Sequence, residues 1–230
     1  MIDESINKVN DIFGAFLIEE SNWVGVEEYP RVEEWMVPIN PPIRMIPFDK
    51  INEVNNPSEY FICFYCKDES FIKILKNPKK YVNMLRKFAG IIGFDYSIYT
   101  DMPIIKQKSQ IYNNLSLSYF FGNNGIPVIP NIRYGIENTK EDFLKAIPKN
   151  SLIAFGTYGF IRTIKEQQVW FDTLHKVINQ LKPSGVVVYG SLPKDLRRWI
   201  DLYQVPVYLY ESYTSLKMKE VKKNANQRQK

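Results

Sequence analysis

The feature that most constrains the fold is a regular alternation of short apolar runs and longer amphipathic stretches between residues 60 and 211. Continuous apolar runs are typical of strands that are buried on both faces of a parallel sheet. The predicted strands are 60–66, 90–97, 126–132, 151–157, 185–191 and 205–211. A strand that recurs about every 20 to 36 residues, with a helix between, predicts an α/β protein with a mostly parallel sheet and right-handed crossovers.

The stretches between these strands have the spacing of amphipathic helices. In the first of them, Asn77-Pro78 has the pattern of an N-cap followed by a first helical residue. Two more apolar runs, 44–48 and 13–18, could add strands to the six. The sequence therefore fits either an open doubly wound sheet or a small, irregular (β/α) barrel. We favour the barrel slightly, because the units repeat evenly and none contains a glycine-rich dinucleotide turn.

Charge and proline divide the chain into three parts. Residues 1–42 are acidic, rich in proline and predicted to be irregular, wrapping a single α/β domain at 43–211. Residues 212–230 hold six basic groups and one acidic group, which predicts a basic and flexible tail. Such a tail attracts nucleic acid through its phosphates, or else serves only as a solubilising terminus.

Several classes of protein are disfavoured. No apolar run approaches the roughly 18 residues that span a bilayer, and the acidic N-terminus does not resemble a signal peptide, so we expect no membrane partner and a cytoplasmic location. Cys63 and Cys66 form a C-x-x-C within an apolar run, and the single histidine, His175, cannot complete a zinc site with them. We expect reduced, buried thiols, no metal site and no cofactor.

A ligand site in either architecture lies at the carboxyl ends of the parallel strands. Asp95 and Asp101 follow one strand and Arg133 follows the next, which makes them the candidate catalytic residues. Asp95 would be a general base or metal ligand, Asp101 its partner and Arg133 an anion clamp. Paired carboxylates there could also hold a divalent cation. The other rim residues, candidates for lining a pocket, are Ser97, Tyr99, Asn131, Tyr134, Thr157 and Ser191.

Each of these residues also has a structural interpretation. Asp101 stands two residues before Pro103, where it could cap the following helix, and Ser191 could cap the helix after it. Asp95 and Arg133 could simply pair and fasten adjacent strand ends. The sequence leaves both interpretations open.

A strongly basic segment extends from Lys73 to Lys87 and contains six basic residues and no acidic one. This pattern is typical of a solvated helix face or of a surface that contacts nucleic acid or an acidic partner. With the tail, it provides the candidate nucleic-acid-binding residues, which are Lys73, Lys76, Lys79, Lys80, Arg86, Lys87, Lys222 and Lys223.

Four stretches together resemble the family named domain of unknown function 4417. They are NPKKYVNMLRKFAGIIGFDYSIYTDMP, NNGIPVIPNIRYG, IPKNSLIAFGTYG and LKPSGVVVYGS, and the resemblance runs from about residue 43 to residue 211. The chain departs from the family pattern at GTYGFIRT, where a Cys or His-Gly is often found. The resemblance implies an origin in a phage, plasmid or integrated element, and it brings no known activity or catalytic residues.

Three functions remain compatible with these observations. The leading hypothesis is an accessory protein of a phage or mobile genetic element that engages nucleic acid through the basic segment and tail. The first alternative is an enzyme that acts on a small phosphorylated or sugar-like ligand at the strand-end rim. The second is an inhibitor or adaptor that binds a host or phage protein.

Overall fold

A computed structural model describes residues 11, 14–135, 137–157 and 163–228 of the chain. Among these residues, seven parallel strands form the centre of the molecule. They are β3 (Arg44–Pro47), β4 (Tyr60–Cys63), β5 (Gly90–Ile92), β6 (Val128–Ile129), β7 (Leu152–Gly156), β8 (Gly185–Tyr189) and β9 (Val207–Tyr210). The predicted α/β class with a mostly parallel sheet is confirmed, and the run 44–48 does supply a strand.

The strands pair in the order β3-β4-β5-β6 and β7-β8-β9. A parallel bridge between Asn131 and Ala154 joins the two sets, so sequence order and spatial order agree throughout. Each strand is followed by a crossover before the next parallel strand, as the alternation in the sequence predicts.

The combined sheet curls strongly. The rings of Tyr65, just after β4, and Tyr189, at the end of β8, stack with their centroids 5.4 Å apart. Four strand spacings of about 4.8 Å would hold these positions about 19 Å apart in a flat sheet. No strand ladder joins β9 to β3 within the described chain, although the Tyr210 hydroxyl donates a hydrogen bond to the Pro42 carbonyl there. The sheet is therefore barrel-like in curvature and is not a closed barrel.

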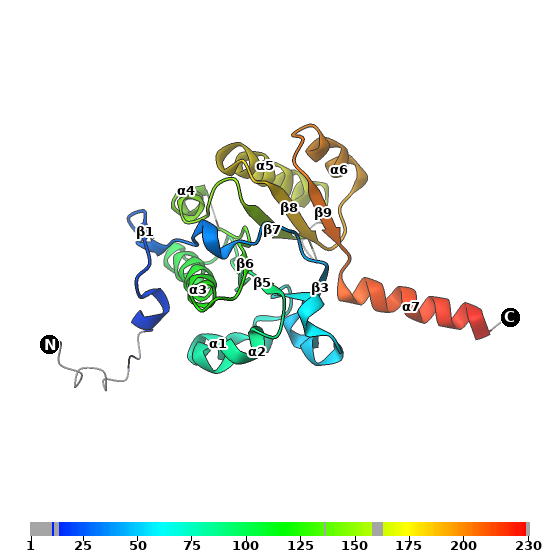
Figure 1. Cartoon of the computed structure of the whole chain (residues 1–230). Helices are drawn as coiled ribbons and strands as arrows, with labels where there is room; N and C mark the ends of the chain where they lie inside the picture. The colour runs from blue at the N-terminus through cyan, green and yellow to red at the C-terminus, as the bar shows by residue number, and fades with distance from the viewer. Residues whose placement is uncertain (1–10, 12–13, 136, 158–162, 229–230) are drawn as a thin grey trace.

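Alternate residues of the strands face the inside and the outside of this curve. The inner cluster takes side chains from every strand, among them Met45, Phe61, Ile92, Ile129, Ala154, Val187, Tyr189 and Tyr208. The outward residues pack against helices that surround the strands in Figure 1. These helices are α1 (Ile72–Lys76), α2 (Val82–Leu85), α3 (Ile104–Asn123), α4 (Glu137–Lys145), α5 (Ile164–Leu181) and α6 (Lys194–Asp201).

Several short elements complete the body. The strands β1 (Trp23–Val24) and β2 (Tyr29–Pro30) form an antiparallel pair, and 3-10 turns occur at η2 (Ala15–Ile18), η3 (Glu34–Met36), η4 (Phe48–Glu53), η5 (Pro57–Glu59), η6 (Asp68–Ser70) and η7 (Pro78–Tyr81). Pro78 begins η7 directly after Asn77, as the sequence predicts. No helix among the described residues is long and apolar enough to cross a membrane.

The run 13–18, which could have added a strand, does not do so in its described residues, since Gly14 caps a turn and Ala15–Ile18 form η2. The Asp11 carboxylate accepts hydrogen bonds of 2.9 Å from the backbone N–H groups of Gly14 and Phe16. Gly14 has a left-handed φ of 75°, which a strand does not contain. The side chain of Asp11 therefore starts a turn and prevents this apolar run from joining the sheet.

The C-terminal tail, predicted to be flexible, forms the helix α7 (Tyr213–Arg228). This helix extends away from the body (Figure 1). Its first residue is fixed, because the Tyr213 N–H donates a 2.9 Å hydrogen bond to the hydroxyl of Tyr189 at the end of β8. The tail thus begins at the same edge of the sheet at which a ligand site is expected.

Candidate functional site

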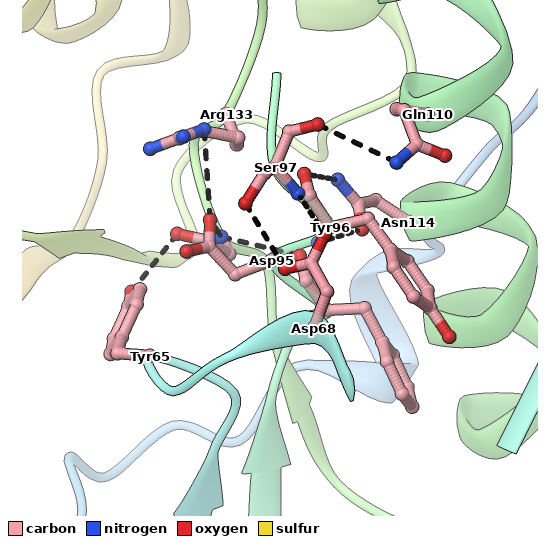
Figure 2. Close-up of polar contacts among 10 residues, drawn as sticks. Tyr65, Asp68, Asp95, Tyr96, Ser97, Gln110, Asn114 and Arg133 are labelled. Carbon is pink, nitrogen blue, oxygen red and sulfur yellow. Dashed lines mark hydrogen bonds and ion pairs between the residues drawn. The ribbon is translucent and has the colours of Figure 1, made fainter. Parts of the chain in front are cut away.

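A chain of buried polar groups lies where β4, β5 and β6 end (Figure 2). Asn131 is at its centre, and its Oδ1 accepts a 2.9 Å hydrogen bond from the Tyr65 hydroxyl. Its Nδ2 donates to the Asp95 carboxylate at 2.8 Å and to the Phe94 carbonyl at 3.2 Å. The side-chain amide of Asn131 therefore links the ends of three neighbouring strands.

Asp95 and Arg133 meet at this edge of the sheet. The Arg133 Nε lies 3.9 Å from the Asp95 Oδ1, and their side chains are 27% and 17% exposed, respectively. Burial raises the pKa of the Asp95 carboxyl above its ordinary value, and the nearby Asp68 adds to this. The charge of Arg133 and the hydrogen bond from Asn131 lower the pKa of the Asp95 carboxyl and so partly offset this increase. The Asp95 carboxyl can therefore take up a proton more readily than a carboxyl in water.

The loop that follows β5 is held by two further contacts (Figure 2). Both the hydroxyl and the backbone N–H of Ser97 donate 3.0 Å hydrogen bonds to the Asp68 carboxylate. On the other side, the buried Asn114 of α3 accepts a 2.8 Å hydrogen bond from the Tyr96 N–H and donates one to the Tyr96 carbonyl. These contacts fix the direction in which the Asp95 side chain leaves the strand end.

The structure separates the two predicted catalytic carboxylates. Asp101 is exposed, whereas Asp95 is within the polar network. The interpretation of Asp101 as a helix cap is also wrong, because Pro103 is the N-cap of α3 and no side chain bonds to this helix start. Pro103 itself has an extended backbone, with φ −52° and ψ 138°, and the helix begins after it without a capping carboxylate.

The remaining pocket candidates have different surroundings. Tyr99 is 56% exposed, whereas Tyr134 is half-buried and lines a cavity beside Arg133. The buried Thr157 hydroxyl lies 3.2 Å and 2.9 Å from the carbonyls of Tyr189 and Ser191. Thr157 therefore connects the ends of β7 and β8 within the structure.

Tyr65, Asp68 and Trp170 belong to this region and are absent from the sequence-based candidates. Tyr65 and Asp68 follow the strand 60–63, so the strand-end rule would have found them had it been applied to this strand as well. Trp170 lies within α5, and its apolar periodicity gives no sign that its indole lines a cavity.

Both cysteines have free thiols, and Cys63 is buried within the inner cluster. Burial raises the pKa of the Cys66 thiol to about 11. Within the described chain, no three His, Cys, Asp or Glu side chains gather in the manner of metal ligands.

The basic segment spans α1, η7, α2 and the turn after α2, which contains Arg86 and Lys87. Its six basic residues are all exposed, and none of them forms a salt bridge with a described acidic residue. Two of them also make structural contacts. Arg86 donates hydrogen bonds of 3.2 and 2.8 Å to the Asn124 carbonyl, and the Lys79 ammonium lies 4.5 Å from the centre of the Phe16 ring. The tail residues Lys222 and Lys223 are exposed on α7.

The two basic regions flank one element, η4. The Phe48 ring of η4 packs 6.3 Å from the Tyr81 ring of η7, and the Lys50 ammonium lies 5.8 Å from the centre of the Tyr213 ring of α7. Tyr213 also hydrogen bonds to Glu53 at the end of η4. The basic segment and the start of α7 are therefore close to each other in space.

Comparison with known proteins agrees with the phage association that the resemblance implied. The family model with the description Domain of unknown function (DUF4417) matches residues 23–206. The Gene 1 protein of Mycobacterium phage L5 is 23% identical over 129 residues, which are 56% of this chain and 56% of the phage protein. The chain thus spans about half the length of this curated relative. No solved structure matches the chain significantly.

Proposed function

Since the chain belongs to the family Domain of unknown function (DUF4417), we propose that it is an accessory protein of a phage or mobile genetic element that engages nucleic acid. The contact surface is the basic segment of α1, η7 and α2 together with α7, and we call it the basic surface. None of the six cations of the basic segment forms a salt bridge with a described acidic residue, and this observation carries the proposal.

The electrostatic argument rests on what surrounds each cation. Some lysines elsewhere in the described chain are paired, as Lys108 is with Glu27 and Lys145 with Asp142, whereas the basic segment gathers six cations within fifteen residues. Lys73, Lys76, Lys80 and Lys87 are exposed without such a partner, so their charge remains available for phosphate groups. Each phosphate that a cation neutralises releases condensed counterions, which favours binding at low salt.

The placement of α7 supports the same surface. The helix starts beside η4, against which the last residue of η7 also packs, and it then extends from the body (Figure 1). Lys217 and Lys219 pair with Glu220 and Glu211, whereas Lys222 and Lys223 lie further out on the exposed helix. A nucleic acid strand along the basic segment could therefore also meet the outer part of α7.

The test is fluorescence anisotropy with labelled single-stranded DNA, duplex DNA and single-stranded RNA over a range of salt concentrations. The variant carries K73Q, K76Q, K80Q and K87Q, which avoids the structural contacts of Lys79 and Arg86. Each duplex phosphate contact contributes about 0.9 to the slope of log K against log salt, so we expect a shallower slope and binding at least tenfold weaker.

The matched control carries K106Q, K149Q, K182Q and K194Q, four exposed lysines outside the basic surface. It has the same net charge as the test variant, and we expect its affinity to change much less. Equal loss of affinity in the two variants would mean that net charge alone is responsible. Absence of binding by the parent at low salt would refute the proposal.

A second candidate function is an enzyme that uses the strand-end rim. The contact between Asp95 and Arg133 favours it, because a carboxyl with a raised pKa beside a guanidinium can exchange a proton while an anion is held. Asp101 has no role in this enzyme hypothesis, because it is exposed and lies outside the polar network around Asn131. If this function is correct, D95N abolishes turnover of the substrate and leaves nucleic-acid binding unchanged.

A further inference from the structure

Most of the helix α7 is exposed to solvent. Its first residue is fixed to the body, because the Tyr213 N–H donates to the Tyr189 hydroxyl and the Tyr213 hydroxyl donates to Glu53. Every residue from Leu216 to Asn224 is exposed, and the helix extends away from the body (Figure 1). An isolated helix of about 12–15 residues is only marginally stable in water, so α7 gains stability from a partner that covers it.

The apolar residues of α7 do not form the stripe that a protein groove requires. Helices that bind in such a groove present apolar anchors at positions i, i+3 or i+4, and i+7. The exposed large apolar side chains of α7 are Leu216, Met218 and Val221. Only Met218 and Val221 share a face, because they are three residues apart, whereas Leu216 and Met218 are two apart. A protein groove would therefore cover apolar surface on one helical turn only.

The charges of α7 suit phosphate groups on two sides of the helix. Glu220 is its one acidic residue, and its basic residues are Lys217, Lys219, Lys222, Lys223 and Arg228. Lys219 and Lys223 are four residues apart and share one side, whereas Lys217 precedes Lys219 by two residues and lies on the opposite side. The ion pairs of Lys217 with Glu220 and of Lys219 with Glu211 are exposed and therefore weak, so phosphate groups can replace them.

The major groove of B-form DNA offers phosphates in this arrangement. It is about 12 Å wide and admits an α-helix, whose diameter is about 10–12 Å, between the backbones of the two strands. The major groove of duplex RNA is deep and narrow, and side chains cannot read it. The last turns of α7 contain Asn224, Asn226 and Gln227. Asparagine and glutamine are the side chains that bond to the adenine edge in the major groove.

We propose that α7 binds in the major groove of duplex DNA, where its lysines contact the phosphates of both strands and Asn224, Asn226 and Gln227 contact base edges. The helix thus identifies the ligand and the reading element of the proposed nucleic-acid function, on which this assignment rests. The basic segment lies near the start of α7, across η4, and contacts the phosphate backbone beside the groove. The segment provides affinity that does not depend on sequence, and α7 provides the sequence preference.

The first experiment identifies the duplex and the groove, with the full chain at low salt. Fluorescence anisotropy compares duplex DNA, duplex RNA of the same sequence and single-stranded DNA, and we expect duplex DNA to bind at least about tenfold more tightly than the other two. Methyl green, which occupies the major groove, should displace the protein, and netropsin, which occupies the minor groove, should not. Equal binding of duplex RNA, or displacement by netropsin alone, would overturn the assignment of α7 and leave the proposed contact of the basic segment with nucleic acid intact.

The second experiment tests base reading. Selection from duplex DNA of random sequence gives the site that the parent protein prefers. The variant with N224A, N226A and Q227A keeps the charge of α7, and alanine favours a helix more than the residues it replaces. We expect the ratio of affinities for preferred and random duplexes to fall at least about tenfold in this variant.

The matched control carries N40A, N55A and Q168A, which also replace two asparagines and one glutamine at exposed positions outside the basic surface. It should keep the ratio of the parent protein. A parent protein without a preferred sequence, or an equal ratio in the two variants, would contradict the reading role of α7. A dimer that forms without DNA and that M218S with V221S dissociates, seen by sedimentation equilibrium, would assign the helix to a second copy and overturn the proposal.

Discussion

The hydroxyl of Tyr65 donates a 2.9 Å hydrogen bond to the Oδ1 of Asn131, although 66 residues separate them along the chain. The bond crosses the carboxyl ends of β4 and β6 and is buried. It places a tyrosine, an asparagine and, through the asparagine amide, the Asp95 carboxylate in one connected group. This group lies at the end of the curled sheet at which ligands of α/β proteins bind.

The first prediction concerns the centre of this group. N131A removes the acceptor of the buried Tyr65 hydroxyl and the donor to Asp95 at the same time. Because an unsatisfied buried group costs about 1–3 kcal/mol, we expect the free energy of unfolding to fall by about 3 kcal/mol. Urea denaturation followed by circular dichroism measures the change.

The control for this substitution is N113A. Asn113 is half-buried on α3 and its amide donates only to the neighbouring Gln110 side chain. We expect a change of about 0.5 kcal/mol or less there, as for most surface substitutions. Similar losses in both variants would show that the Asn131 network adds nothing beyond ordinary side-chain truncation.

The second prediction concerns the close approach of β7 to Tyr65. A methyl group at Gly156 would lie 2.5 Å from the Tyr65 Cε1. The Tyr65 ring cannot move away easily, because it is stacked on Tyr189 and hydrogen bonded to Asn131. We expect G156A to lower the free energy of unfolding by about 1–3 kcal/mol.

A double-mutant cycle identifies the cause of that loss. In the Y65A background the added methyl group has space, so G156A should cost much less than in the parent protein. If the cost is the same in both backgrounds, the clash with Tyr65 is not its source. Chemical denaturation of the four proteins gives the coupling energy.

The third prediction follows from the raised pKa of Asp95. A carboxyl whose pKa is higher in the folded state binds its proton more tightly there than in the unfolded chain. Its contribution to stability is therefore full below the unfolded pKa of about 3.9 and is lost as the pH rises through the folded pKa. D95N lacks this titration, so the stability of D95N relative to the parent should increase from pH 4 to pH 7.

Urea denaturation of both proteins at several pH values measures this difference. D101N is the matched control for the loss of one carboxylate after the same strand, because Asp101 is exposed and outside the polar network. A relative stability of D95N that stays constant, or that decreases toward pH 7, would contradict a raised pKa at Asp95.

The fourth prediction concerns the two thiols. A pKa of about 11 at Cys66 leaves about one thiol in a thousand ionised at pH 8, and burial raises the pKa of Cys63 as well. We expect iodoacetamide to alkylate both thiols at least about 100-fold more slowly in the folded protein than in urea. Mass spectrometry of timed samples measures the rates, and fast alkylation of Cys66 in the folded protein would disprove the prediction.

Much of the fold is predictable from short stretches of the sequence. The runs 152–155 and 186–189 are apolar throughout, which is typical of a strand covered on both faces, and both lie in strands of the sheet. Prediction failed where a single polar contact outweighed an apolar pattern, as when the Asp11 carboxylate starts the turn at Gly14. Such a contact depends on a single side chain, so it leaves no periodic pattern in the sequence.

The candidate site was only partly predictable. The strand-end rule located Asp95, Asn131 and Arg133, because parallel strands end at a common edge and the residue after each strand can be read from the sequence. It could not separate Asp95 from Asp101, since both follow the same strand and only the loop path buries one and exposes the other.

The sequence by itself determined the alternation of strands and helices, the mostly parallel pairing and the edge at which a site lies, because apolar periodicity is a local property. The order of the strands in the sheet came from the structure. Only the tertiary structure decided that the sheet curls until Tyr65 stacks on Tyr189, and that Arg133 and Trp170 share a cavity. These relations depend on the angle between successive strands and on how helices fill the space outside them. They arise from packing among residues distant in sequence, which no short stretch of the chain encodes.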